Sequence, residues 1–164
     1  LNPWATVPVL ELNDGTCISE AIACCRYLEE MYPEPTLMGK EPTEKAFIAM
    51  WEHRMEWDGF LAVAEYFRNT VERMRDRGLT GTANFKQIPA LAERGEERVG
   101  RFFEVLDSRL GESEYVAGDY YTVADITAQV SLDFAARAGL KCPDVKSNIA
   151  RWYAAVDARA SASV

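Results

Sequence analysis

The sequence predicts a mostly α protein, in which a helical bundle follows a short α/β segment made of one β-hairpin and one helix. Two short runs of β-favouring residues stand near the front of the chain, on either side of a turn. Several later segments repeat apolar residues at helical spacing. Modest loops separate those segments, and amphipathic helices joined in this way form bundles.

The first predicted element is the β-hairpin. Residues 7–12 (Val-Pro-Val-Leu-Glu-Leu) form a β-favouring run, residues 13–15 (Asn-Asp-Gly) are a strong turn signal, and residues 16–18 can return as the second strand. Two strands alone are only marginally stable in water. We therefore expect the hairpin to pack on a helix or to belong to a larger sheet.

A helix is predicted directly after the hairpin. Its inward face is marked by apolar residues at helical spacing, namely Ala21, Cys24, Cys25, Leu28 and Met31. We expect Ser19 to cap its start and the proline-rich residues 32–35 to end it. Cys24 and Cys25 should then pack in the interior, where thiols are unreactive.

A break in composition divides the chain into two parts. Residues 34–42 contain two prolines and a glycine, which is typical of a linker between domains. We predict one unit at residues 1–33, this linker, and an all-helical unit at residues 43–164.

Three amphipathic helices stand out in the second unit. The first runs from a cap at Thr43 to about residue 74, the second from about residue 88 to 110, and the last surrounds Trp152. Their expected inward faces are, in chain order, Phe47, Met50, Trp51, Trp57, Leu61, Ala64, Phe67, Val71 and Met74; Val99, Phe102, Phe103, Leu106 and Leu110; and Val145, Ile149, Trp152, Tyr153 and Val156.

A further helix start lies within residues 120–126 (Tyr-Tyr-Thr-Val-Ala-Asp-Ile). Thr122 can accept the amide hydrogen of residue 125, and the Asp125 carboxylate can reach back to the Thr122 amide, which together make a capping box. Asp125 could instead be a catalytic acid. Because both halves of the box are present, we predict a structural role and a loss of about 1 kcal/mol of stability for Asp125→Ala.

Composition and charge exclude several function classes. Lys and Arg number 18 against 26 Asp and Glu, a formal net charge of −8, which argues against nucleic acid or an anionic membrane surface as a partner. No apolar run approaches the roughly 18 residues of a membrane span. The only histidine is His53 and the cysteines form no CxxC pair, so we predict no metal site, reduced thiols and a cytoplasmic protein.

Motifs spread along nearly the whole chain carry a family resemblance. They are Asn2-Pro3, Val7-Pro8-Val9-Leu10-Glu11-Leu12, Ile18-Ser19-Glu20, Cys25-Arg26-Tyr27-Leu28-Glu29-Glu30, Met50-Trp51, Phe67-Arg68-Asn69, Val116-Ala117-Gly118-Asp119, Thr122-Val123-Ala124-Asp125-Ile126 and Arg151-Trp152-Tyr153. In this order they resemble the cytosolic glutathione S-transferase superfamily, and bacterial members most of all. The resemblance implies that residues 1–33 are the remnant of a thioredoxin-like glutathione-binding domain and that the family's helical C-terminal domain follows.

The same resemblance implies that the strand, helix and strand that open such a domain precede Leu1. The Tyr, Ser or Cys that activates the glutathione thiol in this family lies in that part, so the catalytic residue is unknown. The activity of the chain as given is therefore left open.

The resemblance also supplies candidate binding residues. Pro8 would be the family's cis-proline, and the Val7 backbone would pair with the cysteinyl part of glutathione, as a strand edge pairs with a peptide. Glu20 would hold the γ-glutamyl ammonium. Ala21 stands where the family has serine, which removes one hydrogen bond to glutathione. His53, Trp57 and Phe60 would line the electrophile pocket, although Trp57 could equally be core and His53 a solvated surface residue.

The implied function is glutathione transfer in detoxification, by attack of the glutathione thiolate on a hydrophobic electrophile. Glutathione would be a co-substrate, and no other cofactor is implied. The resemblance implies a homodimer with Phe47, Met50 and Trp51 partly in its interface. A glutathione-dependent isomerase or dehalogenase would share this fold. The alternative, favoured by Ala21, is a non-catalytic transferase-like protein that binds apolar ligands or mediates assembly.

Overall fold

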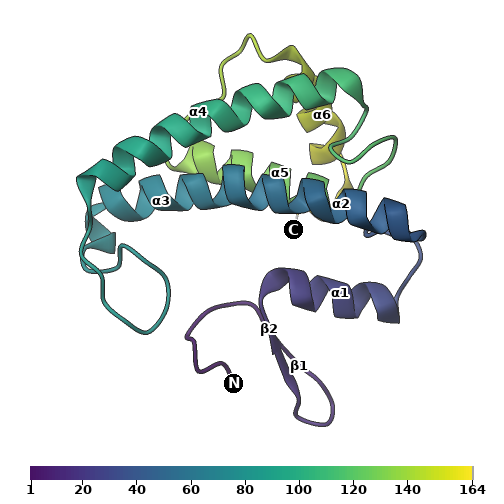
Figure 1. Ribbon diagram of the computed structural model, residues 1–164, viewed down its shortest axis with the longest axis horizontal. Helices are drawn as coiled ribbons and strands as arrows, with labels where there is room; N and C mark the ends of the chain where they lie inside the picture. The colour runs from purple at the N-terminus through teal and green to yellow at the C-terminus, as the bar shows by residue number, and fades with distance from the viewer. Residues whose placement is uncertain (164) are drawn as a thin grey trace.

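The computed structural model describes residues 1–163, and Figure 1 shows them in two parts. The N-terminal part contains β1 (Val9–Glu11), β2 (Cys17–Ser19) and α1 (Ala21–Met31). The larger helical part contains α2 (Pro42–Arg54), α3 (Leu61–Thr70), α4 (Pro89–Glu112), α5 (Val123–Arg137) and α6 (Ser147–Asp157). Three short turns complete it, the π-helical η1 (Met55–Phe60) and the 3-10 helices η2 (Glu72–Met74) and η3 (Ala160–Ser163). The predicted mostly α fold with a hairpin and one helix in front is confirmed.

The predicted hairpin forms at the expected turn. β1 and β2 pair antiparallel, with Leu10 opposite Ile18. Gly15 has φ 83°, a left-handed conformation that glycine adopts without steric cost. The hairpin packs beneath α1, where the Cys24 thiol donates a hydrogen bond to the Ile18 carbonyl at 3.4 Å.

The helix after the hairpin is confirmed, but its predicted cap and most of its inward face are wrong. Ser19 belongs to β2 as the partner of Val9, so Glu20 takes the N-cap position. Leu28 and Met31 are 44% and 54% exposed. Figure 1 shows the hairpin beneath the start of α1, so it leaves the end of the helix uncovered.

The helix α2 begins two residues earlier than predicted. Its N-cap is Glu41 rather than Thr43, and Glu41 and Glu44 form the capping box. Pro42 occupies the first turn, where its missing amide hydrogen has no intrahelical partner to lose.

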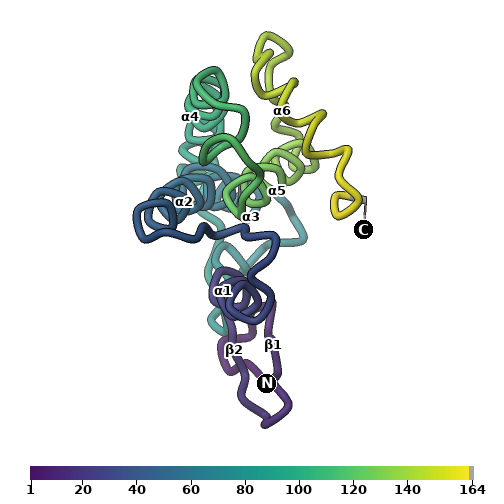
Figure 2. Tube along the Cα trace, turned by 90° about the vertical axis from the view of Figure 1, so that its right-hand side faces the viewer, coloured from purple at the N-terminus to yellow at the C-terminus, as the bar shows by residue number. Residues whose placement is uncertain are grey.

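The segments α2, η1 and α3 continue one another as a single rod, which Figures 1 and 2 show from two sides. The predicted inward face of this rod is wrong, since Phe47, Met50, Trp57 and Leu61 are between 37% and 57% exposed. The buried residues follow the neighbouring face, namely Ile48, Glu52, Met55, Gly59, Ala62, Val63 and Asn69. In the second half of this buried face most residues are small, because α4 approaches closely there. The prediction was wrong because it assigned the bulky apolar side chains to the inward face.

Two glycines permit that close approach. A Cβ atom on Gly59 would lie 2.8 Å from a ring carbon of Phe102, and one on Gly95 would lie 2.6 Å from the backbone nitrogen of Tyr66. The predicted inward face of α4 is confirmed, because Val99, Phe102, Phe103, Leu106 and Leu110 are all buried. Figure 2 shows α4 and α6 on the side of the bundle away from the N-terminal part.

The predicted capping box at the start of α5 is present, and Asp125 does more than close it. Its carboxylate accepts hydrogen bonds from the Thr122 amide at 2.8 Å, the Val116 amide at 2.9 Å and the Trp152 indole at 2.8 Å. Burial raises the pKa of Asp125, and these hydrogen bonds oppose that rise. The residue therefore joins α6 to the start of α5.

The inward face predicted around Trp152 is confirmed for Ile149, Trp152 and Val156, which are buried. Val145 is 81% exposed, because it precedes the first residue of α6. None of the helices described within residues 1–163 combines the length and apolar character needed to cross a membrane.

Candidate functional site

The candidate glutathione-binding residues lie just before β1 and just after β2, and the pairing of Val9 with Ser19 places both pairs at the same end of the hairpin. The Val7–Pro8 peptide bond is cis, as predicted. Val7 is 91% exposed and stands two residues before β1. An open strand edge offers its backbone amides and carbonyls to an extended peptide. The Val7 backbone is thus accessible for the pairing predicted with glutathione.

Glu20 and Ala21 form the N-terminus of α1. Glu20 has φ 71°, a left-handed conformation that is uncommon for residues other than glycine. Its carbonyl accepts the amides of Ala23 and Cys24 at 3.1 and 3.0 Å, so the amides of residues 21 and 22 come before the first bonded turn. Such free amides attract a carboxylate, and strained residues of this kind cluster at ligand sites.

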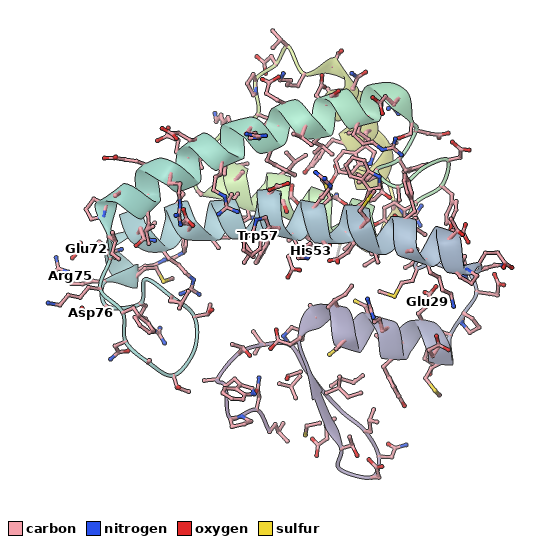
Figure 3. The ribbon with its side chains drawn as sticks, viewed as in Figure 1. Glu29, His53, Trp57, Glu72, Arg75 and Asp76 are labelled. Carbon is pink, nitrogen blue, oxygen red and sulfur yellow. The ribbon has the colours of Figure 1, made fainter. Side chains whose placement is uncertain are left out.

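The candidate electrophile pocket belongs to the helical part. Figure 3 shows His53 and Trp57 on the side of the α2–α3 rod that faces the N-terminal part. Trp57 is 57% exposed, so the alternative that placed it in the core is wrong. The His53 and Trp57 rings stack at 6.3 Å, and Phe60, half-buried, packs against Phe134 at 5.5 Å. His53 itself is exposed.

The π-helical turn η1 determines which way Trp57 faces. The Leu61 amide donates to the Glu56 carbonyl, five residues back, so this turn holds more residues than an α-helical turn. Sequence reasoning missed η1. Its only trace in the sequence is the break in the apolar pattern at residues 58–59 (Asp-Gly). π-Helical turns are frequent at functional sites.

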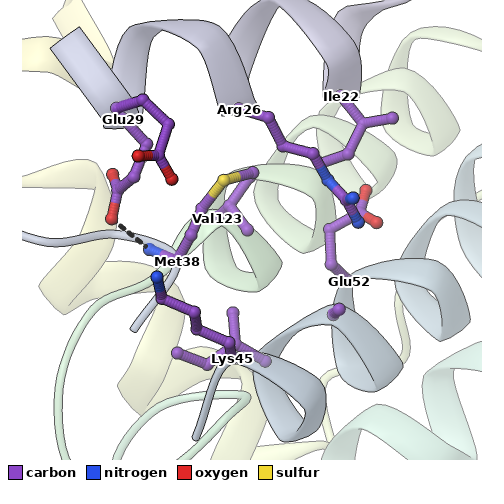
Figure 4. A pocket seen from close by; sticks show the side chains of 10 residues that line it. Ile22, Arg26, Glu29, Met38, Lys45, Glu52 and Val123 are labelled. Atoms are coloured by element: carbon purple, nitrogen blue, oxygen red, sulfur yellow. Dashed lines mark hydrogen bonds between the residues drawn. The ribbon is translucent and has the colours of Figure 1, made fainter. Parts of the chain in front are cut away.

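A separate cavity of about 190 Å³ lies at the junction of the two parts (Figure 4). Its walls come from α1, the connecting segment, α2 and the first residue of α5. They are Ile22, Arg26, Glu29, Glu30, Met38, Lys45, Ile48, Ala49, Glu52 and Val123. No predicted binding residue is among them. The cavity is therefore distinct from the candidate site.

Glu29 holds the wall of this cavity together. Its carboxylate accepts hydrogen bonds from the Thr36 hydroxyl at 2.6 Å and from the Leu37 and Met38 amides at 3.0 and 2.9 Å. Burial opposes ionisation of Glu29, but these hydrogen bonds outweigh it and lower its pKa. Glu29 therefore fastens the connecting segment to α1.

Glu52 is the buried acid of the cavity, at 8% exposure. It accepts one long hydrogen bond from the Thr127 hydroxyl, at 3.5 Å. Burial raises the pKa of Glu52 and neighbouring Glu56 raises it further, while the charge of His53, the Thr127 hydrogen bond and the charge of Arg26 partly offset both effects. Figure 4 shows the Arg26 side chain, from α1, extending toward this acid.

Two of the cysteines, Cys24 and Cys25, lie on α1 at least partly buried, while Cys17 is exposed. Cys24 is 7% exposed, and burial raises the pKa of the half-buried Cys25 thiol. The predicted inert role of these two thiols agrees with that environment. Within residues 1–163, no three His, Cys, Asp or Glu side chains are grouped closely enough to hold a metal ion.

Comparison with known proteins identifies the family. Residues 73–160 match the family model described as glutathione S-transferase, C-terminal domain, and residues 1–31 match glutathione S-transferase, N-terminal domain. Glutathione S-transferase 2 of Saccharomyces cerevisiae is 35% identical over 160 residues, which is 98% of this chain and 66% of the yeast protein. The chain belongs to the glutathione S-transferase family.

Solved structures of this family share the fold of the chain. A glutathione S-transferase domain-containing protein from Marinobacter aquaeolei has a TM-score of 0.86 and 39% identity, over 96% of this chain and 74% of that one. Gtt2 of Saccharomyces cerevisiae has a TM-score of 0.88 and 34% identity, with the same coverage of 96% and 74%. The chain spans 66% of the curated yeast sequence and about half of two curated plant transferases that it matches, from Arabidopsis thaliana and Nicotiana tabacum.

Proposed function

We propose that this protein is a glutathione transferase, in which the N-terminal part binds glutathione and the Trp57 side of the helical part receives a hydrophobic electrophile. The glutathione sulfur attacks an electrophilic carbon as the thiolate. With an aryl halide a carbon–sulfur bond forms, the carbon–halogen bond breaks, the halide leaves, and the thiol proton passes to solvent. Membership of the transferase family is the observation that carries this proposal.

The cysteinyl and γ-glutamyl residues of glutathione each have a proposed partner in the N-terminal part. The backbone of Val7, beside cis-Pro8, pairs with the cysteinyl residue. The Glu20 carboxylate binds the γ-glutamyl ammonium, and the free amides at the start of α1 bind the γ-glutamyl carboxylate. Ala21 has no hydroxyl to add to these contacts, so we propose weaker glutathione binding than a serine at this position would allow.

The electrophile is proposed to contact His53, Trp57 and Phe60. The exposed indole of Trp57 offers a large flat surface, and covering such a surface with an aromatic electrophile releases water from both. Glutathione is a co-substrate, and the proposed reaction uses no metal or other cofactor. A role in detoxification within the cytoplasm fits these substrates.

We also propose that the protein is a homodimer through the exposed apolar side of α2. Phe47 and Met50 are each 43% exposed on that side, and Trp51, which directly follows Met50, is half-buried. Isolated exposed apolar residues are common on monomers, but two exposed and one half-buried apolar residue on one helical surface suit an interface. Light scattering of the purified protein measures the mass of this assembly.

Conjugation of glutathione to 1-chloro-2,4-dinitrobenzene, followed by absorbance of the product, tests the proposed function. We expect glutathione-dependent turnover, and we expect Glu20→Gln to raise the KM for glutathione. Glu11→Gln, which changes an exposed acid of the hairpin, is the matched control and should leave that KM unchanged. Binding of an apolar dye together with no affinity for glutathione would contradict the proposal and support the non-catalytic alternative.

A further inference from the structure

One arginine of α4 contacts Trp57 twice. The Arg98 guanidinium lies over the Trp57 ring, 5.8 Å from its centroid, and its Nη2 donates a hydrogen bond to the Trp57 carbonyl at 2.5 Å. One contact holds the indole and the other holds the backbone of η1.

Arg98 is itself held in place by an acid of α3. Its Nη1 donates to Glu65 Oε2 at 3.2 Å, while Arg94 donates two hydrogen bonds to the same carboxylate, at 2.8 and 2.9 Å. The Glu65 side chain is 15% exposed, and the hydrogen bonds and charge of Arg94, with those of Arg98, lower its pKa. The guanidinium of Arg98 therefore has a charged partner on one side and Trp57 on the other.

The chemistry of these contacts requires arginine. A planar guanidinium can stack on an indole while its separate N–H groups reach a carboxylate and a carbonyl. A lysine ammonium is a compact point charge and cannot make the stacked contact and both hydrogen bonds in the same geometry. The Arg98 side chain is only 26% exposed, so solvent weakens the stacking less than at an open surface.

We infer that Arg98 is a positioning residue for the electrophile site, which holds the indole of Trp57 in the orientation that receives an aromatic substrate. This inference rests on the proposed function, because it assigns Trp57 to the electrophile side. Arg98 acts through Trp57 and does not contact the substrate. Its loss should change the affinity for the electrophile and leave the affinity for glutathione as it was.

The chain supplies a matched control in Arg94. Arg94 lies one helical turn from Arg98 on α4 and binds the same Glu65. Its side chain is 59% exposed, and none of its contacts is to Trp57. Arg94→Met therefore removes an arginine from the same cluster without touching the indole.

The experiment compares Arg98→Met, Arg98→Lys and Arg94→Met with the unaltered protein in two measurements. The first is the ¹⁵N–¹H resonance of the Trp57 indole, assigned by its absence in Trp57→Phe. The second is the KM for 1-chloro-2,4-dinitrobenzene and the KM for glutathione. We expect Arg98→Met to move the Trp57 resonance and to raise the KM for the aryl halide about five- to tenfold. Arg98→Lys should show nearly the same two changes as Arg98→Met. Arg94→Met should leave both the Trp57 resonance and the KM for the aryl halide unchanged.

The outcomes separate this inference from the proposed function. Absence of turnover in the unaltered protein contradicts the proposed function, and the inference, which rests on it, falls with it. Turnover with an unchanged KM for the aryl halide in Arg98→Met overturns the inference alone. It is also overturned if Arg94→Met moves the Trp57 resonance as far as Arg98→Met does, or if the KM for glutathione rises in parallel. The expected pattern of both measurements supports it.

Discussion

The helical part and the N-terminal part differ in how they are held together. In the helical part, large side chains such as Trp152, Phe102 and Leu106 are fully buried. Within residues 1–31, Cys24, at 7% exposure, is the one buried hydrophobic residue, and Val7 and Trp4 are 91% and 66% exposed. Burial of apolar surface is the main source of folding stability, so the helical part supplies most of the stability of the protein.

The difference indicates that the two parts have separate roles. The N-terminal part offers an open strand edge and a helix start, whose backbone groups can bind a peptide. The helical part supplies the rigid support and presents the Trp57 side of the α2–α3 rod. A change in the bundle should therefore alter stability, whereas a change at the start of α1 should alter binding.

The largest effect is expected for Asp125→Ala, in the bundle. It leaves the buried Trp152 indole and the Val116 and Thr122 amides without their acceptor, so we expect a loss of about 3–5 kcal/mol in the free energy of unfolding. This exceeds the value expected from the capping box alone. Urea denaturation measures it, and exposed Asp119→Ala is the control. A loss below 1 kcal/mol for Asp125→Ala would show that these contacts contribute little.

A smaller effect is expected where α3 and α4 approach most closely. The Cβ of Gly95→Ala would lie 2.6 Å from the Tyr66 backbone nitrogen, so the helices must move apart, at a cost of about 2–3 kcal/mol. Gly100→Ala is the matched control on the same helix, with open space around its Cβ. It should stabilise the protein by about 0.5–1 kcal/mol. Equal melting temperatures for the two variants would refute the close approach.

At the start of α1 we expect a change in binding without a change in stability. Ala21→Ser adds a hydroxyl that can donate to the γ-glutamyl carboxylate, so glutathione should bind about tenfold more tightly. Residue 21 is exposed, and the melting temperature should therefore stay the same. Calorimetric titration measures the affinity. Unchanged binding in this variant would place the γ-glutamyl group elsewhere.

The smallest effect is a pH dependence at the junction of the two parts. Burial raises the pKa of Glu52 above its unfolded value, so the folded protein binds this proton more tightly. The resulting stability is present at low pH and is lost as the pH rises through the folded pKa. Glu52→Gln should thus raise the melting temperature near pH 7 more than near pH 4. An equal rise in melting temperature at both pH values would show that folding does not raise the pKa of Glu52.

The turn and the capping box could be predicted from the sequence, whereas the inward face of the α2–α3 rod could not. The hairpin turn at Gly15 and the box at Thr122 and Asp125 depend on residues close in the chain. The inward face of the α2–α3 rod depends on which surface α4 covers. Gly59 and Ala62 are buried on that face, but their residue types alone do not indicate that α4 packs there.

The candidate site shows the same limit. The sequence indicated Pro8, Glu20 and Trp57 through their place in family motifs, and their roles in binding remain predictions. The π-helical turn and the contact between Arg98 and Trp57 could not be predicted, because 41 residues separate the two side chains in the chain. The sequence patterns that predict hairpins and helices give no information about a contact between residues so far apart in the chain.

Amide hydrogen exchange with and without glutathione tests the central claim, that glutathione binds to the N-terminal part while the helical part provides the support. Without glutathione, we expect the amides of β1 and α1 to exchange faster than those of α4 and α5. With glutathione, residues 7–11 and 21–24 should slow, and the amides of α4 and α5 should not change. Unchanged exchange in residues 7–11 and 21–24, or slowing confined to the cavity wall on α2, would contradict the account.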